Sequence, residues 1–220
     1  MAFMTPVRSD SEPPHQIKKN SAPLRLWHWI SVLIISGSLI TVLINSTITN
    51  THQTSSLIKS EIQKAGVTVT NDQARSAAHA LSDKVWGVHT YFGYCLAGLL
   101  VFRLMLEFFQ LADQKFTRKL KSAYAQFNAT KRNREIARHE LAVKIIYCTF
   151  YVLLIIQVIT GLALAFEGIA FFKLYRHPIK SLHGFCMYLI LAFIAVHLLG
   201  VFLAERKNSK GIVSDMINGG

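Results

Sequence analysis

Four apolar stretches, each about 20 residues long, set the strongest limit on what this chain can fold into. They run roughly from Leu24 to Ile44, Val85 to Leu106, Val143 to Ala165 and Leu182 to Leu203. A helix rises about 1.5 Å per residue, so each stretch is long enough to cross the ~30 Å hydrocarbon core of a bilayer. The pattern therefore predicts an all-α integral membrane protein built as a bundle of four transmembrane helices.

A soluble helical protein is the alternative, and it fits the composition poorly. The chain has 220 residues, of which 51% are hydrophobic and 16% charged. A soluble fold would have to bury four long apolar helices with few amphipathic helices left to cover them. The first 22 residues are polar and lack the apolar core of a cleaved signal peptide. We therefore expect the first apolar stretch to remain as a membrane anchor.

The chain divides into one membrane domain with polar ends. We expect a flexible cytoplasmic tail over residues 1–22, the four-helix membrane domain over 23–205, and a cytoplasmic C-terminal tail over 206–220. The loop from Asn45 to Lys84 has the pattern of one or two short helices, and it is either a docking surface or a solvated connector. The basic loop from Leu111 to Arg138 predicts a helix on the inner leaflet. Its apolar positions at roughly helical spacing are Phe116, Leu120, Tyr124 and Phe127.

The net charge of +12 follows the membrane rather than a nucleic acid. In a four-span protein, both chain ends and the loop before the third span share one side. These segments hold 15 basic residues, against seven in the two opposite loops. Loops rich in Lys and Arg stay in the cytoplasm, so both termini are expected there. We expect no nucleic-acid partner.

The three cysteines do not suggest a metal centre or a disulfide framework. Cys95, Cys148 and Cys186 each lie inside an apolar stretch, without the paired spacing of a zinc or iron–sulfur site. The chain also lacks the Cys-x-x-Cys-His pattern of covalent haem attachment. The cysteines are therefore interpreted as packing residues.

Four of the nine histidines lie inside the apolar stretches, where polar side chains are costly and usually functional. They are His28, His89, His183 and His197. The last two are 14 residues apart on one helix, which is within about 40° of a whole number of turns and a rise of ~21 Å. One helix thus presents two metal ligands on the same face at two membrane depths.

Low-spin haem takes two opposed axial ligands, so each histidine of the fourth span needs a partner at its own depth. The first span begins inside with His28, which matches the inner His197. The second span begins outside with His89, which matches His183. The pattern predicts two haems, with axial pairs His28/His197 and His89/His183. Histidines that are merely hydrogen-bonded within the core are the competing interpretation.

Two arginines are candidates for pairing with haem propionates, which need cationic or hydrogen-bonding partners near the interface. Arg103 lies 14 residues beyond His89 on the same helix face, at the depth of the inner pair. Arg25 lies about one turn before His28. The alternative for both is that the side chain reaches toward lipid headgroups.

Small and aromatic residues near the histidines allow two interpretations. Three glycines would permit close approach either of a flat macrocycle or of a neighbouring helix. They are Gly93, Gly184 and Gly200. The tryptophans are interpreted as interfacial anchors rather than cofactor groups. They are Trp27, Trp29 and Trp86.

With these residues placed, the chain resembles the bacterial cytochrome b561 superfamily. Within it, the chain is similar to the b-type cytochrome subunits of nickel–iron hydrogenases and to formate dehydrogenase gamma subunits. The resemblance covers nearly everything from Pro23 to Gly219. The segments that carry it are Pro23-Leu-Arg-Leu-Trp-His28-Trp, His89-Thr-Tyr-Phe-Gly93 with Arg103, Thr160-Gly161-Leu-Ala-Leu, Leu182-His183-Gly184 with His197, and Gly211-Ile-Val-Ser214-Asp-Met216-Ile-Asn-Gly219.

The resemblance implies a multi-pass protein of the bacterial inner membrane that carries electrons through two b haems. The partners it implies are membrane lipid, the quinone pool and an iron–sulfur, dehydrogenase or hydrogenase subunit on the outer face. The sequence does not assign the quinone site. His139, Lys144 and Tyr147 lie near the depth of the inner haem, but each is better interpreted as a helix-start or interfacial residue.

Three functions remain open from the sequence. The chain is either an electron-transfer subunit of an oxidoreductase complex, with catalysis in its partner, or a freestanding superoxide or quinol oxidoreductase. A haem-free transporter or assembly factor is the third class. Bis-histidine ligation favours electron transfer, since it leaves no open position on the iron.

Overall fold

The computed structural model describes residues 22–109, 124–125, 134–166, 168–207 and 212–218. All the regular elements in these ranges are helices. They are α1 (Ala22–Thr47), α2 (Thr51–Lys64), α3 (Asn71–Phe109), α5 (Arg134–Ala165), α6 (Ala170–Leu174), α7 (Arg176–Lys207) and α8 (Ile212–Asn218).

Four helices are long and apolar enough to cross a membrane, which confirms the predicted spans. The apolar segments are Ala22–Thr47 in α1, Asn71–Leu106 in α3, Leu141–Ala165 in α5 and Arg176–Arg206 in α7. Many large apolar side chains on them face outward, and Leu33 and Tyr91 are each 71% exposed. A surface of this kind suits contact with lipid rather than with water.

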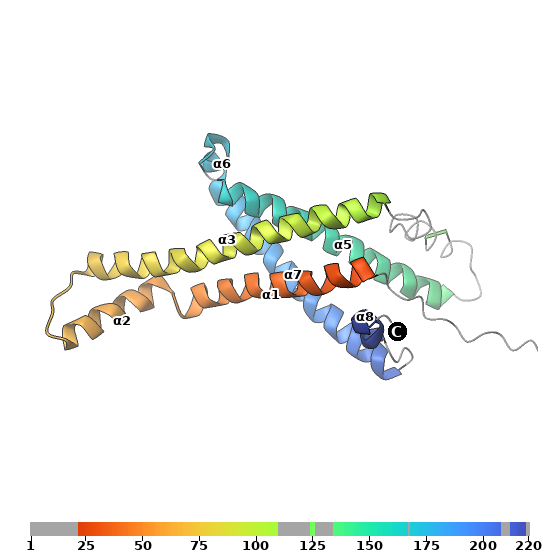
Figure 1. Cartoon of the computed structure of the whole chain (residues 1–220), viewed down its shortest axis with the longest axis horizontal. Coiled ribbons are helices and arrows are strands. Elements are labelled where there is room, and N and C mark those ends of the chain that lie inside the picture. The colour runs from red at the N-terminus through yellow and green to blue at the C-terminus, as the bar shows by residue number, and fades with distance from the viewer. Residues whose placement is uncertain (1–21, 110–123, 126–133, 167, 208–211, 219–220) are drawn as a thin grey trace, which may run out of the picture.

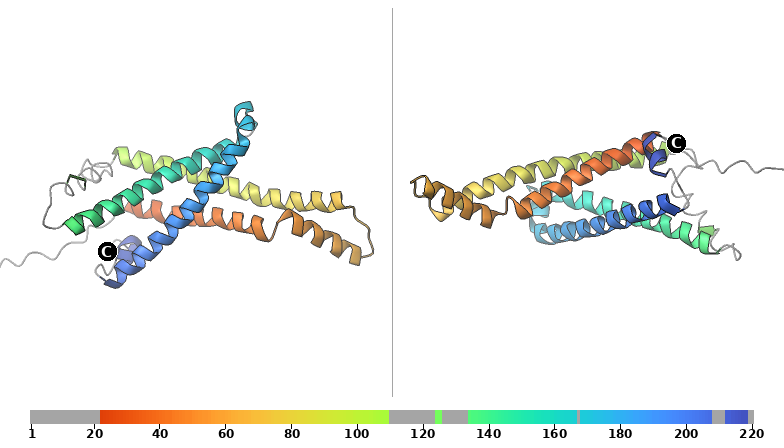
Figure 2. Two further views of the ribbon diagram at one scale, coloured as in Figure 1. Left: turned by 180° about the vertical axis from the view of Figure 1, so that it is seen from behind. Right: turned by 90° about the horizontal axis from the view of Figure 1, so that it is seen from below.

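The spans pack as two pairs, α1 with α3 and α5 with α7, and α3 also contacts α5. Figures 1 and 2 show that α1 and α5 begin at the end of the molecule where α3 and α7 finish. The short helix α8 lies at this same end, and the Nε1 atom of Trp29 donates a hydrogen bond of 2.9 Å to the carbonyl of Met216. The helices α2 and α6 lie toward the opposite end (Figure 1).

The core of the bundle is small, because most apolar side chains face outward. Its buried cluster takes one residue from α1, two from α3 and two from α5: Trp27, Leu96, Leu100, Leu154 and Val158. These side chains hold α3 between α1 and α5. The histidines of α1 and α3 therefore have fixed positions relative to α5.

The loop before the second span forms a helical hairpin, as the sequence predicted. Helix α2 packs on the first turns of α3, and together they project beyond the other helices (Figure 1). Thr70 and Gln73 cap α3 reciprocally: the Gln73 amide donates to the Thr70 hydroxyl at 3.2 Å, and the Thr70 amide donates to the Gln73 side chain at 3.0 Å. Gly66 turns the chain between the helices with φ of +81°, where glycine has no steric cost.

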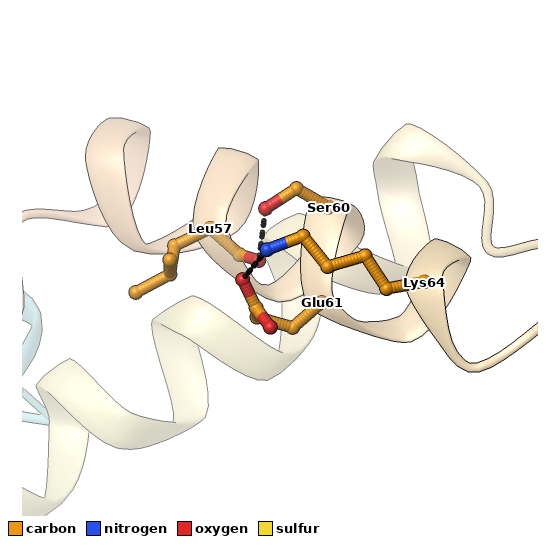
Figure 3. Close-up of polar contacts among 4 residues, drawn as sticks. All are labelled: Leu57, Ser60, Glu61 and Lys64. Carbon is orange, nitrogen blue, oxygen red and sulfur yellow. Dashed lines mark hydrogen bonds and ion pairs between the residues drawn. The ribbon is translucent and has the colours of Figure 1, made fainter.

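Helix α2 is a polar surface helix with local stabilising contacts (Figure 3). Lys64 and Glu61 form an ion pair of 2.7 Å one turn apart, and the Ser60 hydroxyl donates to the Leu57 carbonyl at 2.8 Å. The Lys59 ammonium donates to the Asn71 side chain at 2.6 Å, which ties α2 to the start of α3. The exposed ion pair contributes little, about 0.5 kcal/mol, so α2 depends mainly on packing against α3.

Some sequence predictions fall partly or wholly outside the described residues. The N-terminal tail lies outside them except for its last residue, Ala22, which begins α1. Of the four positions expected to form an inner-leaflet helix, Tyr124 alone is described. The cysteines are free thiols inside the spans: Cys95 is exposed on the helix surface, Cys148 is half-buried and Cys186 is buried.

Candidate functional site

The four intramembrane histidines come together as two facing pairs. The ring centres of His89 in α3 and His183 in α7 are 6.3 Å apart, with an interplanar angle of 84°. Those of His28 in α1 and His197 in α7 are 6.4 Å apart, at 58°. Because 14 residues of α7 separate its two histidines, the pairs lie at levels ~21 Å apart along the helix.

The spacing within each pair fits one metal atom between two rings. An imidazole nitrogen binds a first-row metal at about 2.0 Å and lies about 1.1 Å from its own ring centre, which gives a centre-to-centre distance of ~6.2 Å. Among the described residues, no group of three or more His, Cys, Asp or Glu side chains could hold a bare metal ion. Each pair thus brings two imidazole rings to a spacing that suits a shared metal, and a haem would supply the other ligands through its own macrocycle.

The outer pair, His89 and His183, is held by hydroxyl groups from the neighbouring helices. Nδ1 of His89 lies 2.9 Å from the Thr41 hydroxyl, 3.3 Å from the Ser38 hydroxyl and 3.3 Å from the Ser38 carbonyl. Nδ1 of His183 lies 2.9 Å from the Thr160 hydroxyl. These contacts orient both rings through Nδ1, so Nε2 is the nitrogen of each ring that could bind a metal.

Gln157 is the second polar group at the outer pair. Its amide donates to Nε2 of His183 at 3.0 Å, while its carbonyl oxygen is buried without a hydrogen-bond partner among the described residues. A metal at Nε2 requires this amide to move aside. Gln157 therefore lies where it would contact a bound cofactor.

The inner pair, His28 and His197, has an aromatic environment instead. The ring of His197 lies parallel to Phe193, with centres 5.9 Å apart, and edge-on to Tyr147 at 6.2 Å. The ring of His28 lies edge-on to Trp29 at 5.3 Å, and its Nδ1 atom is buried without a hydrogen-bond partner in the described part of the chain. The two pairs thus have ligands of the same type in different surroundings.

Arg103 lies in the bundle at the level of the inner pair, next to α1. Its side chain is 8% exposed, and Nε donates to the Tyr151 hydroxyl at 3.1 Å. The guanidinium carbon lies 5.9 Å from the ring centre of Trp27 and 5.5 Å from that of Tyr151. The alternative that Arg103 reaches toward lipid headgroups does not fit this burial. Arg25 is half-buried near the start of α1.

Trp27 corrects one expectation, because it is not an interfacial anchor. It is 7% exposed, its Nε1 donates to the Leu99 carbonyl at 3.0 Å, and its ring stacks on Tyr151 at 6.0 Å. A buried indole satisfied in this way belongs to the core. Trp29 and Trp86 are 41% and 42% exposed, and this exposure is compatible with their predicted role as interfacial anchors.

The glycines that are closely packed differ from those singled out in the sequence. A Cβ atom at Gly93, Gly184 or Gly200 would have no neighbouring atom within 4 Å, so packing between described helices does not require these glycines. At Gly161, a Cβ would lie 3.2 Å from Cε1 of His183, and at Gly37 it would lie 2.6 Å from the ring of Phe92. Gly161 therefore gives the His183 ring room against α5.

Sequence reasoning missed the hydroxyl and amide groups around the outer pair. Thr41, Gln157 and Thr160 are polar residues inside apolar spans, and this unusual position was the sequence signal that could have identified them. Thr41 lies 13 residues beyond His28, a rise of ~20 Å that brings it to the outer level.

Comparison with known proteins supports the same class of molecule. A family model described as prokaryotic cytochrome b561 matches residues 19–219. No curated protein and no solved structure showed a significant match. The matched region includes all four spans and both histidine pairs. The chain belongs to the prokaryotic cytochrome b561 family, and it is a membrane b-type cytochrome of electron transfer.

Proposed function

We propose that this cytochrome holds two b haems and carries electrons across the inner membrane. The electrons would pass between a dehydrogenase or hydrogenase subunit on the outer face and the quinone pool. The observation that carries the proposal is the pair of facing histidines at each of two levels of α7. A helix that supplies one ligand at each level would hold two redox centres in line across the bilayer.

In this proposal each histidine pair would hold one haem through its iron. His89 and His183 would hold the outer haem, and His28 and His197 would hold the inner one. When bound, haem supplies a one-electron change between ferric and ferrous iron. Two histidine ligands for each haem would leave no free position on the iron for oxygen or substrate. The residues therefore favour electron transfer over chemistry on a bound molecule.

Arg103 and Arg25 are proposed to pair with propionates of the inner haem. Arg103 is a cation kept within the bundle at this level, where an anion gains strongly from a charge-assisted hydrogen bond. Arg25 precedes His28 by about one turn on α1. Together they would anchor the cofactor from α3 and α1.

The quinone would bind beside the inner haem, close to Tyr147. This side chain is 38% exposed, and its ring centre is 6.2 Å from that of His197. A molecule that reaches Tyr147 from the lipid would thus approach the inner ligand directly. Lys144 lies about one turn earlier on α5 and is half-buried. The side chain of His139 lies outside the described residues.

The function is tested with the full chain purified and then reconstituted in lipid vesicles. We expect a b-type spectrum after dithionite, two haems per chain, and haem reduction by a quinol. Chemical reduction from the outer face should also reduce a quinone on the inner side. Absence of visible absorbance, in protein made with adequate haem, would overturn the proposal. A stable complex with an iron–sulfur protein would favour the electron-transfer subunit, whereas direct reduction of the haem by superoxide in the lone protein would favour the freestanding oxidoreductase.

The proposed orientation places both termini and α8 in the cytoplasm, and the α2 hairpin outside. We predict that Ser60→Cys reacts with an impermeant thiol reagent in intact cells, whereas Ser214→Cys reacts only after the membrane is opened. Both positions are exposed. The background lacks Cys95, Cys148 and Cys186, and the cysteine-free chain is the control. Labelling of Ser214→Cys in intact cells would invert the orientation.

A further inference from the structure

Two buried threonines face the outer histidine pair from opposite sides. Thr41 of α1 is 5% exposed, and its hydroxyl oxygen lies 2.9 Å from Nδ1 of His89. Thr160 of α5 is 7% exposed, and its hydroxyl oxygen lies 2.9 Å from Nδ1 of His183. Each outer histidine therefore contacts a threonine on a helix other than its own.

The single hydrogen of each threonine hydroxyl is already committed to the backbone. The Thr41 hydroxyl donates to the Ser38 carbonyl at 2.5 Å, and the Thr160 hydroxyl donates to the Ile156 carbonyl at 2.7 Å. A hydroxyl has one hydrogen to donate and two lone pairs to accept with. At both histidine contacts the threonine oxygen must therefore accept, and the ring nitrogen Nδ1 must donate.

Two further contacts also indicate that Nδ1 of each outer histidine carries the proton. Nδ1 of His89 also lies 3.3 Å from the Ser38 carbonyl oxygen, which can only accept a hydrogen bond. Nε2 of His183 accepts from the Gln157 amide, so the ring proton of His183 is on Nδ1. Both outer histidines thus carry the Nδ1 proton, and each presents the lone pair of Nε2.

We propose that Thr41 and Thr160 are positioning residues that fix this tautomer and hold the outer haem at a lower midpoint potential than the inner one. An acceptor on Nδ1–H makes Nε2 a stronger electron donor, which favours the ferric state. His28 at the inner pair has a buried Nδ1 without a partner among the described residues. The difference directs an electron from the outer site to the inner site. This inference rests on the proposed dihaem function.

The test compares Thr41→Val, Thr160→Val and the double variant with the parent chain. Valine keeps the branched shape and removes the hydroxyl. We expect a higher outer midpoint potential in each single variant, a larger rise in the double, and an unchanged inner potential. Outer haem affinity should fall by about tenfold in each single variant. Thr41→Ser and Thr160→Ser retain a hydroxyl and should restore the parent potential.

Thr149→Val is the matched control. Thr149 also lies in α5, and its hydroxyl donates to the Ile145 carbonyl at 3.1 Å, but its side chain is exposed and no histidine contact is found in the described region. This variant loses the same kind of backbone bond and should leave both potentials unchanged. An outer potential that does not rise in the double variant, with haem retained, would overturn the proposal.

The ring tautomer is measured separately, by nitrogen-15 NMR of the histidines in the full chain prepared without haem. We expect Nδ1–H signatures for His89 and His183. In the valine variants the Nδ1–H signal should move toward that of a weaker hydrogen bond, while the Ser38 carbonyl and the Gln157 amide still favour the same tautomer. This readout does not depend on haem binding, so it distinguishes the two proposals. A chain that never binds haem but shows these tautomers refutes the dihaem function alone. An Nε2–H tautomer at either histidine refutes the role of the threonines.

Discussion

Replacing His89 or His183 with alanine is expected to remove the outer haem and leave the inner one. His28→Ala and His197→Ala are expected to do the reverse. Each facing pair spans about the distance that two nitrogens on one iron require, so loss of either ring leaves that iron with one protein ligand. Haem content should fall from two to about one per chain in all four variants, and redox titration should show which haem remains.

His177→Ala is the matched control for this series. His177 lies in the first turn of α7, the helix that carries both His183 and His197, but its side chain is exposed. This variant should keep both haems with unchanged potentials. If His28→Ala and His89→Ala lost the same haem, the assignment of the pairs would be wrong. If any single variant lost both haems while the chain stayed folded, the two sites would not be independent.

The fold could be predicted because its main determinants are local. Four apolar stretches of sufficient length fix the four spans, and backbone groups within hydrocarbon must be satisfied by helices. The sequence predicted one or two short helices between Asn45 and Lys84, and this loop holds α2 and the first turns of α3. The capping of α3 by Thr70 and Gln73 is a similarly local signal that the prediction did not use.

The site could be predicted only in part, because contacts between helices depend on their rotation and register. The depths of the histidines follow from counting residues along each helix. In contrast, the hydrogen bond between Thr41 and Nδ1 of His89 depends on how α1 packs against α3. Trp27 shows the same limit: its position near a helix end suggested an anchor, but the rotation of α1 turns it into the core. The roles of the four histidines as haem ligands stay a prediction, which the haem content of the alanine variants tests.

Arg103→Leu is expected to lower the midpoint potential of the inner haem and weaken its retention while largely sparing the outer haem. A cation kept in a bundle of low dielectric stabilises the more negative ferrous state of a nearby haem. In the proposed site it would also neutralise a propionate that is otherwise left desolvated. Each kcal/mol of lost interaction corresponds to a fall of roughly 40 mV for a one-electron couple. A redox titration that resolves both haems measures the change.

Three variants separate the charge of Arg103 from its other contacts. Arg103→Lys keeps the charge but loses the planar group that can grip a carboxylate with two hydrogen bonds, so its effect should be intermediate. Tyr151→Phe removes the hydroxyl that accepts from Nε but leaves the cation in place, so the potential should change little. Arg75→Leu removes an exposed arginine from the part of α3 that projects with α2, and should leave both haems unchanged.

The changes in the midpoint potentials of the two haems distinguish the possible roles of Arg103. Arg103 lies 14 residues, or ~21 Å, beyond His89 on α3, and it packs against Trp27, the residue before His28. Its field should therefore act mainly on the inner site. In these proposals Arg103 would raise the inner potential and the threonine hydroxyls would lower the outer one, so both effects would favour electron movement toward the inner site. An unchanged inner potential with full haem content would show that Arg103 only stabilises the packing of Trp27 and Tyr151. A shift confined to the outer haem would mean that α3 runs opposite to the proposed orientation relative to the haems.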